Sequence, residues 1–253
     1  MITIKNEEAI SIMREAGVRL ATIFTKIEKL IKADISSAEI DRQIEVWLGE
    51  SEMRGESKGF YGYRHVSCIS FNDEVVHGVP SSAKLVKIGD LVKVDICASW
   101  QGYCVDMART FFVGEPSKKV KLLIYAAQAS LDAGIAEARP GRRLSDISAA
   151  IQRESKQYGI VRDFAGHGIG KTMHEAPEIA NFGKSGQGPL LKAGMTFAIE
   201  PMITMGDYPV YVAEDGWTVK TRDKSLAAHV EDTVLITENE PEIFTRLQNA
   251  RIK

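Results

Sequence analysis

The sequence predicts an α+β fold of two similar halves, and three observations support this prediction. Apolar residues recur at helical spacing in two stretches near the start, residues 10–31 and 36–48. Runs rich in strand-forming residues follow them. The same order restarts after residue 115, and a shift of 107 residues matches Met13 with Val120, Phe24 with Leu131, Ile40 with Ile147 and Ile44 with Ile151. Such a duplication places a functional site between the halves.

The first two helices have recognisable starts. Asn6 is suited to cap the first helix, and two glutamates follow it in the first turn, where they suit the helix dipole. The apolar face of this helix comprises Ile10, Met13, Gly17, Leu20, Phe24, Ile27 and Ile31. Ser36 and Glu39 have capping-box spacing, so we expect the second helix to begin at Ser36.

The remaining elements follow in two blocks. We expect strands at residues 67–71, 91–98 and 103–113, then a helix after Pro116-Ser117. A fourth helix follows Pro140-Gly141 and ends near Gly159; further strands are expected at 195–203, 217–221 and 229–237. Residues 181–189 have the composition of a surface loop, and no stretch resembles a linker. The prediction is one compact domain, residues 1–253, with halves of about 1–115 and 116–253.

Composition excludes several classes of protein. Of 253 residues, 44% are hydrophobic and 26% charged, which excludes wholesale disorder. The 32 basic and 34 acidic side chains give a net charge of −2, which argues against a specific nucleic-acid binder or a polybasic membrane protein. Three cysteines without a C-x-x-C motif indicate reduced thiols. Without a signal peptide or a long apolar run, we expect a soluble cytoplasmic protein with no membrane association.

Four acids interrupt apolar strand patterns, which points to a metal site. They are Asp95, Asp106, Glu200 and Glu231. Burying an ionised carboxylate costs several kcal/mol unless a cation or hydrogen-bond donors compensate for it. His167, between two glycines, adds an imidazole. Four carboxylates and one imidazole suit two divalent ions such as Mn²⁺, Fe²⁺, Co²⁺ or Zn²⁺. The residues therefore favour a two-metal hydrolase.

Other motifs carry less information. Residues 165–172 resemble a phosphate-binding loop, but Ala165 stands where that motif requires glycine, and Pro177 comes too soon for a long helix. His174 provides a second imidazole seven residues after His167. We expect His65 and His229 to be structural residues at the surface or at the edge of the core.

The order Asp95, Asp106, His167, Glu200, Glu231 resembles the five metal ligands of the methionine aminopeptidases, within the wider pita-bread metallopeptidase family. Nearly the whole chain is similar to the bacterial type I enzymes. The stretches that carry the resemblance are residues 68–80, 166–170, 174–177, 199–201 and 215–219. The resemblance implies the pita-bread fold, in which two pseudo-twofold-related halves surround a central antiparallel sheet.

The resemblance also implies roles for particular residues. Asp95 would bind one metal, Asp106 and Glu231 would bridge both, and His167 and Glu200 would complete the second. Glu200 would be the general base, His174 would hydrogen-bond the substrate, and His77 would contact the peptide beyond the scissile bond. By position, the methionine pocket would comprise Phe60, Tyr63, Cys68, Met173 and Trp217. The implied reaction removes the initiator methionine of nascent chains, with a preference for a small second residue. The physiological metal stays open.

Four departures from the family pattern affect the rim of the site and its specificity. Tyr61 replaces a common histidine, Met173 a common phenylalanine, residues 64–66 a Gly/Pro-containing turn, and Asp232 the usual histidine after Glu231. Glu-Asp-Thr and His-Glu-Ala-Pro also occur in Xaa-Pro peptidases, so a proline-directed peptidase is the alternative. Those enzymes usually carry an extra N-terminal domain and lack the Asp215-Gly-Trp segment. A non-catalytic relative that binds partners or RNA is a third possibility. We expect a monomer, which could act near the ribosome exit.

Overall fold

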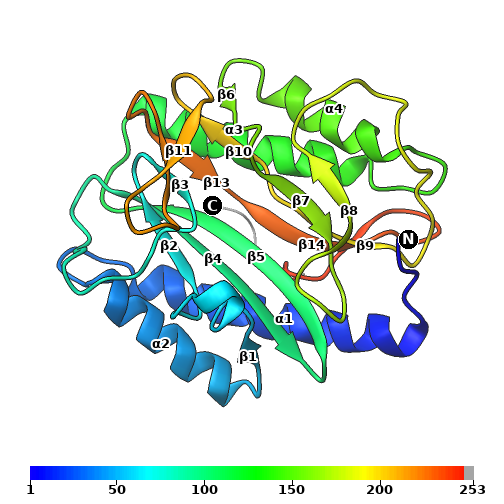
Figure 1. Cartoon of the computed structure of the whole chain (residues 1–253), viewed down its shortest axis with the longest axis horizontal. Helices are drawn as coiled ribbons and strands as arrows, with labels where there is room; N and C mark the ends of the chain where they lie inside the picture. Colours follow the sequence, from blue (N-terminus) through cyan, green and yellow to red (C-terminus); the bar gives the residue numbers. More distant parts are fainter. Residues whose placement is uncertain (248–253) are drawn as a thin grey trace.

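The computed structural model describes residues 1–247, so the last six residues of the expected domain lie outside the described part. A nine-stranded antiparallel sheet crosses the molecule in the order β1-β4-β5-β14-β9-β7-β8, with β2 paired to β4 and β15 to β14 (Figure 1). Its strands are β1 (Arg54–Gly55), β2 (Cys68–Phe71), β4 (Leu91–Trp100), β5 (Tyr103–Phe112), β7 (Ala165–Gly168), β8 (Glu175–Ala180), β9 (Thr196–Ile199), β14 (Glu231–Leu235) and β15 (Glu242–Ile243).

Two three-stranded sheets complete the β-structure of the described residues. One has the order β13-β10-β6 and the other the order β11-β12-β3. Their strands are β3 (Glu74–Val76), β6 (Gly159–Ile160), β10 (Met202–Thr204), β11 (Val210–Val212), β12 (Val219–Thr221) and β13 (Ala227–His229). A 3-10 helix, η1 (Phe60–Gly62), precedes β2.

The helices begin where the capping residues predict. They are α1 (Glu7–Leu30), α2 (Ser37–Glu50), α3 (Lys118–Ala136) and α4 (Leu144–Glu154). The Asn6 side chain accepts a hydrogen bond from the Ala9 amide at 2.9 Å, and Ser36 and Glu39 form the expected capping box. Gly17 faces the core on α1, where a Cβ atom would lie 2.3 Å from the Phe244 carbonyl oxygen. The close approach of α1 to the backbone of Phe244 therefore requires glycine at position 17.

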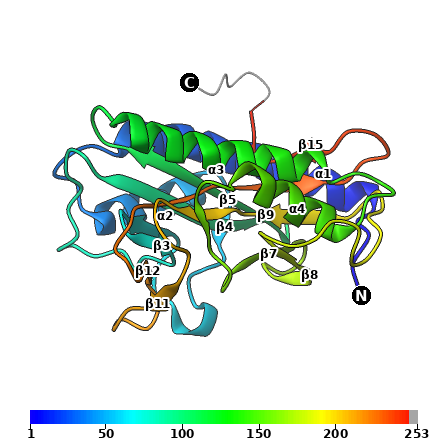
Figure 2. The ribbon, with the colours of Figure 1, turned by 90° about the horizontal axis from the view of Figure 1, so that it is seen from above.

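The helices and the sheets form layers. Helices α1 and α3 lie along one side of the central sheet, and β3, β11 and β12 lie on the other side (Figure 2). One apolar core joins α1 and α2 to β2, β4 and β5, and a second joins α3 and α4 to β9 and β14. Strands that follow the first helix pair meet strands that follow the second at the β5–β14 pairing. Within residues 1–247, no helix has the length and apolarity needed to span a membrane.

Several boundaries differ from the sequence prediction. The expected strand at 195–203 is divided into β9 and β10 by Glu200-Pro201, because proline lacks the N–H that a strand interior requires. The expected strand at 229–237 is divided into β13 and β14. Helix α4 ends at Glu154, where the Ser155 hydroxyl donates to the Ile151 carbonyl, and not near Gly159. Strands β7 and β8 were not predicted, because β7 is rich in glycine and Pro177 lies in the interior of β8.

Candidate active site

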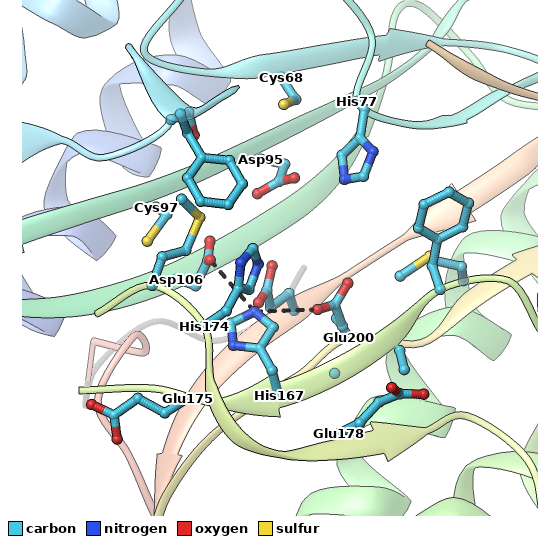
Figure 3. A pocket seen from close by; sticks show the side chains of 18 of the residues that line it. Cys68, His77, Asp95, Cys97, Asp106, His167, His174, Glu175, Glu178 and Glu200 are labelled. Atoms are coloured by element: carbon cyan, nitrogen blue, oxygen red, sulfur yellow. Dashed lines mark ion pairs between the residues drawn. The ribbon is translucent and has the colours of Figure 1, made fainter. Parts of the chain in front are cut away.

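A cavity of about 490 Å³ opens on the face of the central sheet away from α1 and α3 (Figure 3). Strands from both halves of the chain line it. The lining includes all the predicted site residues: Asp95, Asp106, His167, Glu200, Glu231, His77, His174, Phe60, Tyr63, Cys68, Met173 and Trp217. The structure therefore brings together residues that are widely separated in the sequence.

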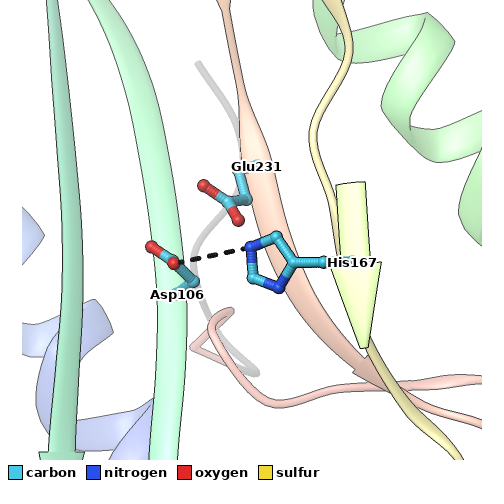
Figure 4. A group of neighbouring side chains, drawn as sticks. All are labelled: Asp106, His167 and Glu231. Carbon is cyan, nitrogen blue, oxygen red and sulfur yellow. Dashed lines mark ion pairs between the residues drawn. The ribbon is translucent and has the colours of Figure 1, made fainter. Parts of the chain in front are cut away.

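Strand register places three of the four acids on one face. Asp95 pairs with Ala108 across β4 and β5, and Glu231 pairs with the same Ala108 across β14 and β5. Asp106 is two residues from Ala108 on β5, so its side chain leaves the sheet on the same side. Glu200 follows β9 directly, at the break before Pro201. The side chains of Asp106, Glu231 and His167 converge from three different strands (Figure 4).

Two close backbone contacts hold His167 in place. Cβ atoms at Gly166 and Gly168 would lie 2.4 Å and 2.2 Å from the carbonyl oxygens of Ala198 and Ala176. His167 Nδ1 lies 3.0 Å from the Gly168 carbonyl oxygen and donates to it, which leaves the lone pair on Nε2. Nε2 lies 3.6 Å from Glu200 Oε1 and 4.0 Å from Asp106 Oδ2. This tautomer and orientation suit a metal ligand.

The acids lack a cation supplied by the protein. Burial raises the pKa values of Asp95, Glu200 and Glu231 well above their ordinary range, and neighbouring acids raise them further. Burial raises the pKa of Asp106 to about 6, although hydrogen bonds from Cys97 and Met107 oppose the shift. Among the described residues, no lysine or arginine lines the cavity, and Glu231 Oε1 has no hydrogen-bond partner. Four buried acids without a counter-charge fit divalent cations.

The three histidines of the cavity are neutral at physiological pH. Burial lowers the pKa values of His77 and His167 to about 4, and the nearby His174 contributes to both shifts. Burial also lowers the pKa of His174. The His174 ring contacts the His167 ring edge to face, with centroids 4.5 Å apart, and Phe60 at 5.5 Å. His77 adopts a positive φ of 57° and packs against Phe164.

One end of the cavity has aromatic and sulfur-containing walls. The Tyr63 and Trp217 rings pack edge to face at 4.9 Å. The Tyr63 hydroxyl donates to the Ser67 carbonyl at 3.1 Å, which fixes the ring beside Cys68. Polarisable sulfur and aromatic surfaces suit a thioether side chain.

His229 does not lie at the surface, which was one of the two positions expected for it. It is 1% exposed on β13, and its Nε2 lies 3.7 Å from Glu200 Oε2. Together with Glu200 and Glu231 it forms a second group that could hold a cation. Within the described range 1–247, neither ring nitrogen has a hydrogen-bond partner. Its position two residues before Glu231 was the available signal, but the break between β13 and β14 made its direction unpredictable.

Other lining residues were not predicted. Cys97, Phe164 and Met202 contribute to the cavity wall. Period-two alternation from Asp95 identifies Cys97, whereas Phe164 and Met202 are brought in by tertiary packing.

The departures from the family pattern lie in different places. Tyr61 is 87% exposed at the rim, against the Phe60 ring. His65 pairs with Asp41 at 2.9 Å, as expected for a structural residue. Asp232 points to the opposite face of the sheet from Glu231 and pairs with Arg109 and Arg246.

The segment that resembles a phosphate-binding loop, residues 165–172, forms β7 and the turn after it. It is followed by β8 and not by a helix.

Comparison with known proteins agrees with this geometry. The model of metallopeptidase family M24 matches residues 11–238. A methionine aminopeptidase of Clostridium acetobutylicum is 44% identical over 247 residues, which cover 97% of this chain and 99% of the relative. The crystal structure of a methionine aminopeptidase from Thermotoga maritima matches with 40% identity and a TM-score of 0.96, covering 98% of this chain and 100% of the other.

A larger enzyme shares the fold at lower similarity. The prolidase from Pyrococcus furiosus is 25% identical with a TM-score of 0.78, and the match covers 97% of this chain but 66% of the prolidase. The full-length matches and the acid-rich cavity lead to the same conclusion: this chain belongs to metallopeptidase family M24.

Proposed function

We propose that this protein is a methionine aminopeptidase that removes the N-terminal methionine from peptides and nascent proteins. The observation that carries the proposal is the convergence of four acids, three histidines and an apolar, sulfur-containing pocket on one cavity. The full-length relatives that are named methionine aminopeptidases support it.

We propose that the acid cluster holds two divalent ions, for which Mn²⁺, Fe²⁺, Co²⁺ and Zn²⁺ are the candidates. Asp95, Asp106, His167, Glu200 and Glu231 would hold them. The partnerless Glu231 Oε1 and the free Nε2 of His167 support this donor set. When bound, the ions activate water and polarise the scissile carbonyl.

The side chains of the chain itself move the protons. The Glu200 carboxylate accepts a proton from the attacking water and delivers it to the leaving amine. Neutral His174 donates a hydrogen bond to the substrate carbonyl oxygen as negative charge develops there. His77 contacts the peptide beyond the scissile bond. Because both imidazoles are neutral, each can donate a hydrogen bond without adding charge to the cavity.

The side chain of the substrate methionine occupies a pocket lined by Phe60, Tyr63, Cys68, Met173 and Trp217. Phe60 is 38% exposed and contacts His174, so the pocket mouth adjoins the proposed catalytic group. We also propose a preference for a small second residue, as the family resemblance implies.

Peptide cleavage by metal-reconstituted protein tests the proposal. We expect turnover of Met-Ala-Ser and negligible turnover of Xaa-Pro peptides. Cleavage of Xaa-Pro peptides alone would establish the proline-directed alternative, which the Glu231-Asp-Thr sequence favours. No turnover with any of the four metals would favour a binding protein on the same scaffold. Glu200→Gln should remove most turnover, and a near-parental rate would exclude Glu200 as the general base.

We further propose that residues 1–253 act as one monomeric domain with halves of about 1–115 and 116–253. Removal of initiator methionine places the protein in the cytoplasm, near the ribosome exit. The pairing of β5 with β14 and the burial of Met13, Val120, Ile40 and Ile147 at matched positions support the two-half description.

A further inference from the structure

The segment that precedes β8 carries two residues of the proposed substrate site. It comprises residues 171–174, of which Met173 contributes to the methionine pocket and His174 faces the substrate. Lys171, Thr172 and His174 are exposed, and the segment has no regular secondary structure. Its position must therefore be fixed by neighbouring groups.

The side chain of Glu175 provides one such fixed point. Its Oε1 accepts a hydrogen bond from the Lys171 amide at 2.8 Å, which closes the segment into a loop. Its carboxylate points away from the cluster of Asp106, His167 and Glu200 (Figure 3). The Glu175 carboxylate thus lies outside the acid cluster. It fixes segment 171–174 at both ends, because Glu175 follows His174 directly and bonds the Lys171 amide.

Residues 1–6, which precede α1 and are called the N-terminal arm here, hold Glu175 in turn. The Lys5 ammonium donates to Glu175 Oε2 at 2.8 Å and the Thr3 hydroxyl donates to the same oxygen at 2.5 Å. The Lys5 and Glu175 side chains are 6% and 14% exposed, so solvent screens this ion pair little. Burial raises the pKa of Glu175, but the bonds from Lys5 and Thr3 outweigh it, and the pKa lies below its ordinary value.

Two close contacts fix the position of the N-terminal arm. The Lys5 amide donates to the Gly194 carbonyl at 2.8 Å, which anchors the backbone of the arm. A Cβ atom at Gly170 would lie 2.4 Å from Lys5 Cε and 2.6 Å from Glu175 Oε1, so the lysine stem passes directly over this glycine. The N-terminus lies beside β8 in both views of the ribbon (Figures 1 and 2).

We propose that Lys5 and Glu175 are positioning residues, through which the N-terminal arm holds segment 171–174 in its substrate-binding conformation. The proposal rests on the proposed aminopeptidase function for its effect on substrate. Without the ion pair, the segment populates other conformations and substrate binding must select the competent one. Apparent affinity then falls in proportion to the competent fraction, while the bound complex is unchanged.

Lys5→Met tests this proposal, because it keeps the apolar stem over Gly170 and removes the ammonium. Lys26→Met is the matched control, since it removes a cation from an exposed ion pair with Glu50 on α2. For Met-Ala-Ser, we expect KM to rise about tenfold in Lys5→Met with kcat within about threefold of the parent. Glu175→Gln should raise KM to a similar extent. The double variant Lys5→Met/Glu175→Gln should have a KM close to that of either single variant, because both substitutions break the same ion pair. Thr3→Val should raise KM by less.

Three outcomes would overturn the proposal. They are a KM for Lys5→Met equal to that of Lys26→Met, a loss confined to kcat, or a loss that follows the melting temperature alone. Hydrogen exchange of the metal-free protein provides a readout without turnover: the Lys171 amide should exchange faster in Lys5→Met than in either the parent or Lys26→Met. If the parent fails to cleave Met-Ala-Ser, the proposed function fails. Unchanged exchange at Lys171 would then separately exclude the anchor.

Discussion

Glu231 and Asp232 are neighbours on β14, yet their side chains enter opposite surroundings. Asp232 is fully buried on the helix side, where it accepts hydrogen bonds from Arg109 Nη2 and Arg246 Nε, each at 2.6 Å, and from Thr245 Oγ1 at 2.7 Å. Glu231 is 2% exposed on the cavity side, where acids surround it, and its Oε1 has no partner among residues 1–247.

The difference shows that burial alone does not identify a functional acid. Both carboxylates are removed from water, and both need compensation for the lost hydration. The protein supplies two guanidinium groups to Asp232, so that acid stabilises the fold. It supplies no cation to Glu231, so the compensating charge must come from solution. The position of the positive charge therefore separates the structural face of the sheet from the proposed metal-binding face.

Glu231→Gln should have the largest effect on this contrast. It removes a proposed metal ligand, so we expect turnover of Met-Ala-Ser to fall at least about 1,000-fold, a loss typical of removing a charge-stabilising group. The metal-free protein should melt at the same temperature or higher, because an unpaired buried acid is removed. Glu28→Gln, on the exposed surface of α1, is the control. A metal-free protein that becomes much less stable would contradict the contrast.

Asp232→Asn should have the opposite pattern. It leaves Arg109 and Arg246 without their shared counter-charge, so we expect the free energy of unfolding to fall by about 3 kcal/mol. Urea denaturation of the metal-free protein measures this change. Metal affinity by calorimetry should change far less than in Glu231→Gln. Loss of metal binding with unchanged stability would show that the two faces are not separate in function.

Metal affinity should weaken as the pH falls, and Asp106 should contribute to this loss below a pH of about 6. In the metal-free protein burial raises the pKa of Asp106 to about 6, so the acid binds a proton below that pH and a cation must displace it. We expect about a tenfold loss of affinity per pH unit for each proton displaced. His167, with a pKa of about 4, stays neutral in this window. Titration calorimetry in buffers of different ionisation enthalpy counts the protons, and pH-independent affinity would refute the argument.

Arg246→Lys should have the smallest effect. The substitution keeps the charge beside Asp232 but loses the fork that also reaches Asp132 at 2.6 Å. We expect a loss of about 1 kcal/mol in unfolding free energy, because contacts with two carboxylates become a contact with one. Thermal unfolding of Arg246→Lys measures this loss. Arg14→Lys, which alters a separate ion pair with Glu242, is the control. A loss as large as that of Asp232→Asn would show that charge alone does not explain the stability.

Much of this protein was predictable from sequence because the signals are local. Asn6, Ser36 and Ser117 cap helices through hydrogen bonds within three residues, and the apolar faces of those helices follow the helical period. The acids at positions 95, 106, 200 and 231 stood out because strand patterns are otherwise apolar. The resemblance to a metallopeptidase family then assigned them roles, and the family membership is confirmed.

Only the tertiary structure decided which partner each charged side chain meets. Sequence alone did not show that Asp232 pairs with Arg109 and Arg246, that His229 lies beside Glu200, or that Lys5, near the N-terminus, reaches Glu175. A strand alternates its faces every residue, so a small shift in register or a break moves a side chain to the opposite surroundings. Pairing between distant segments fixes that register, and no local pattern encodes it.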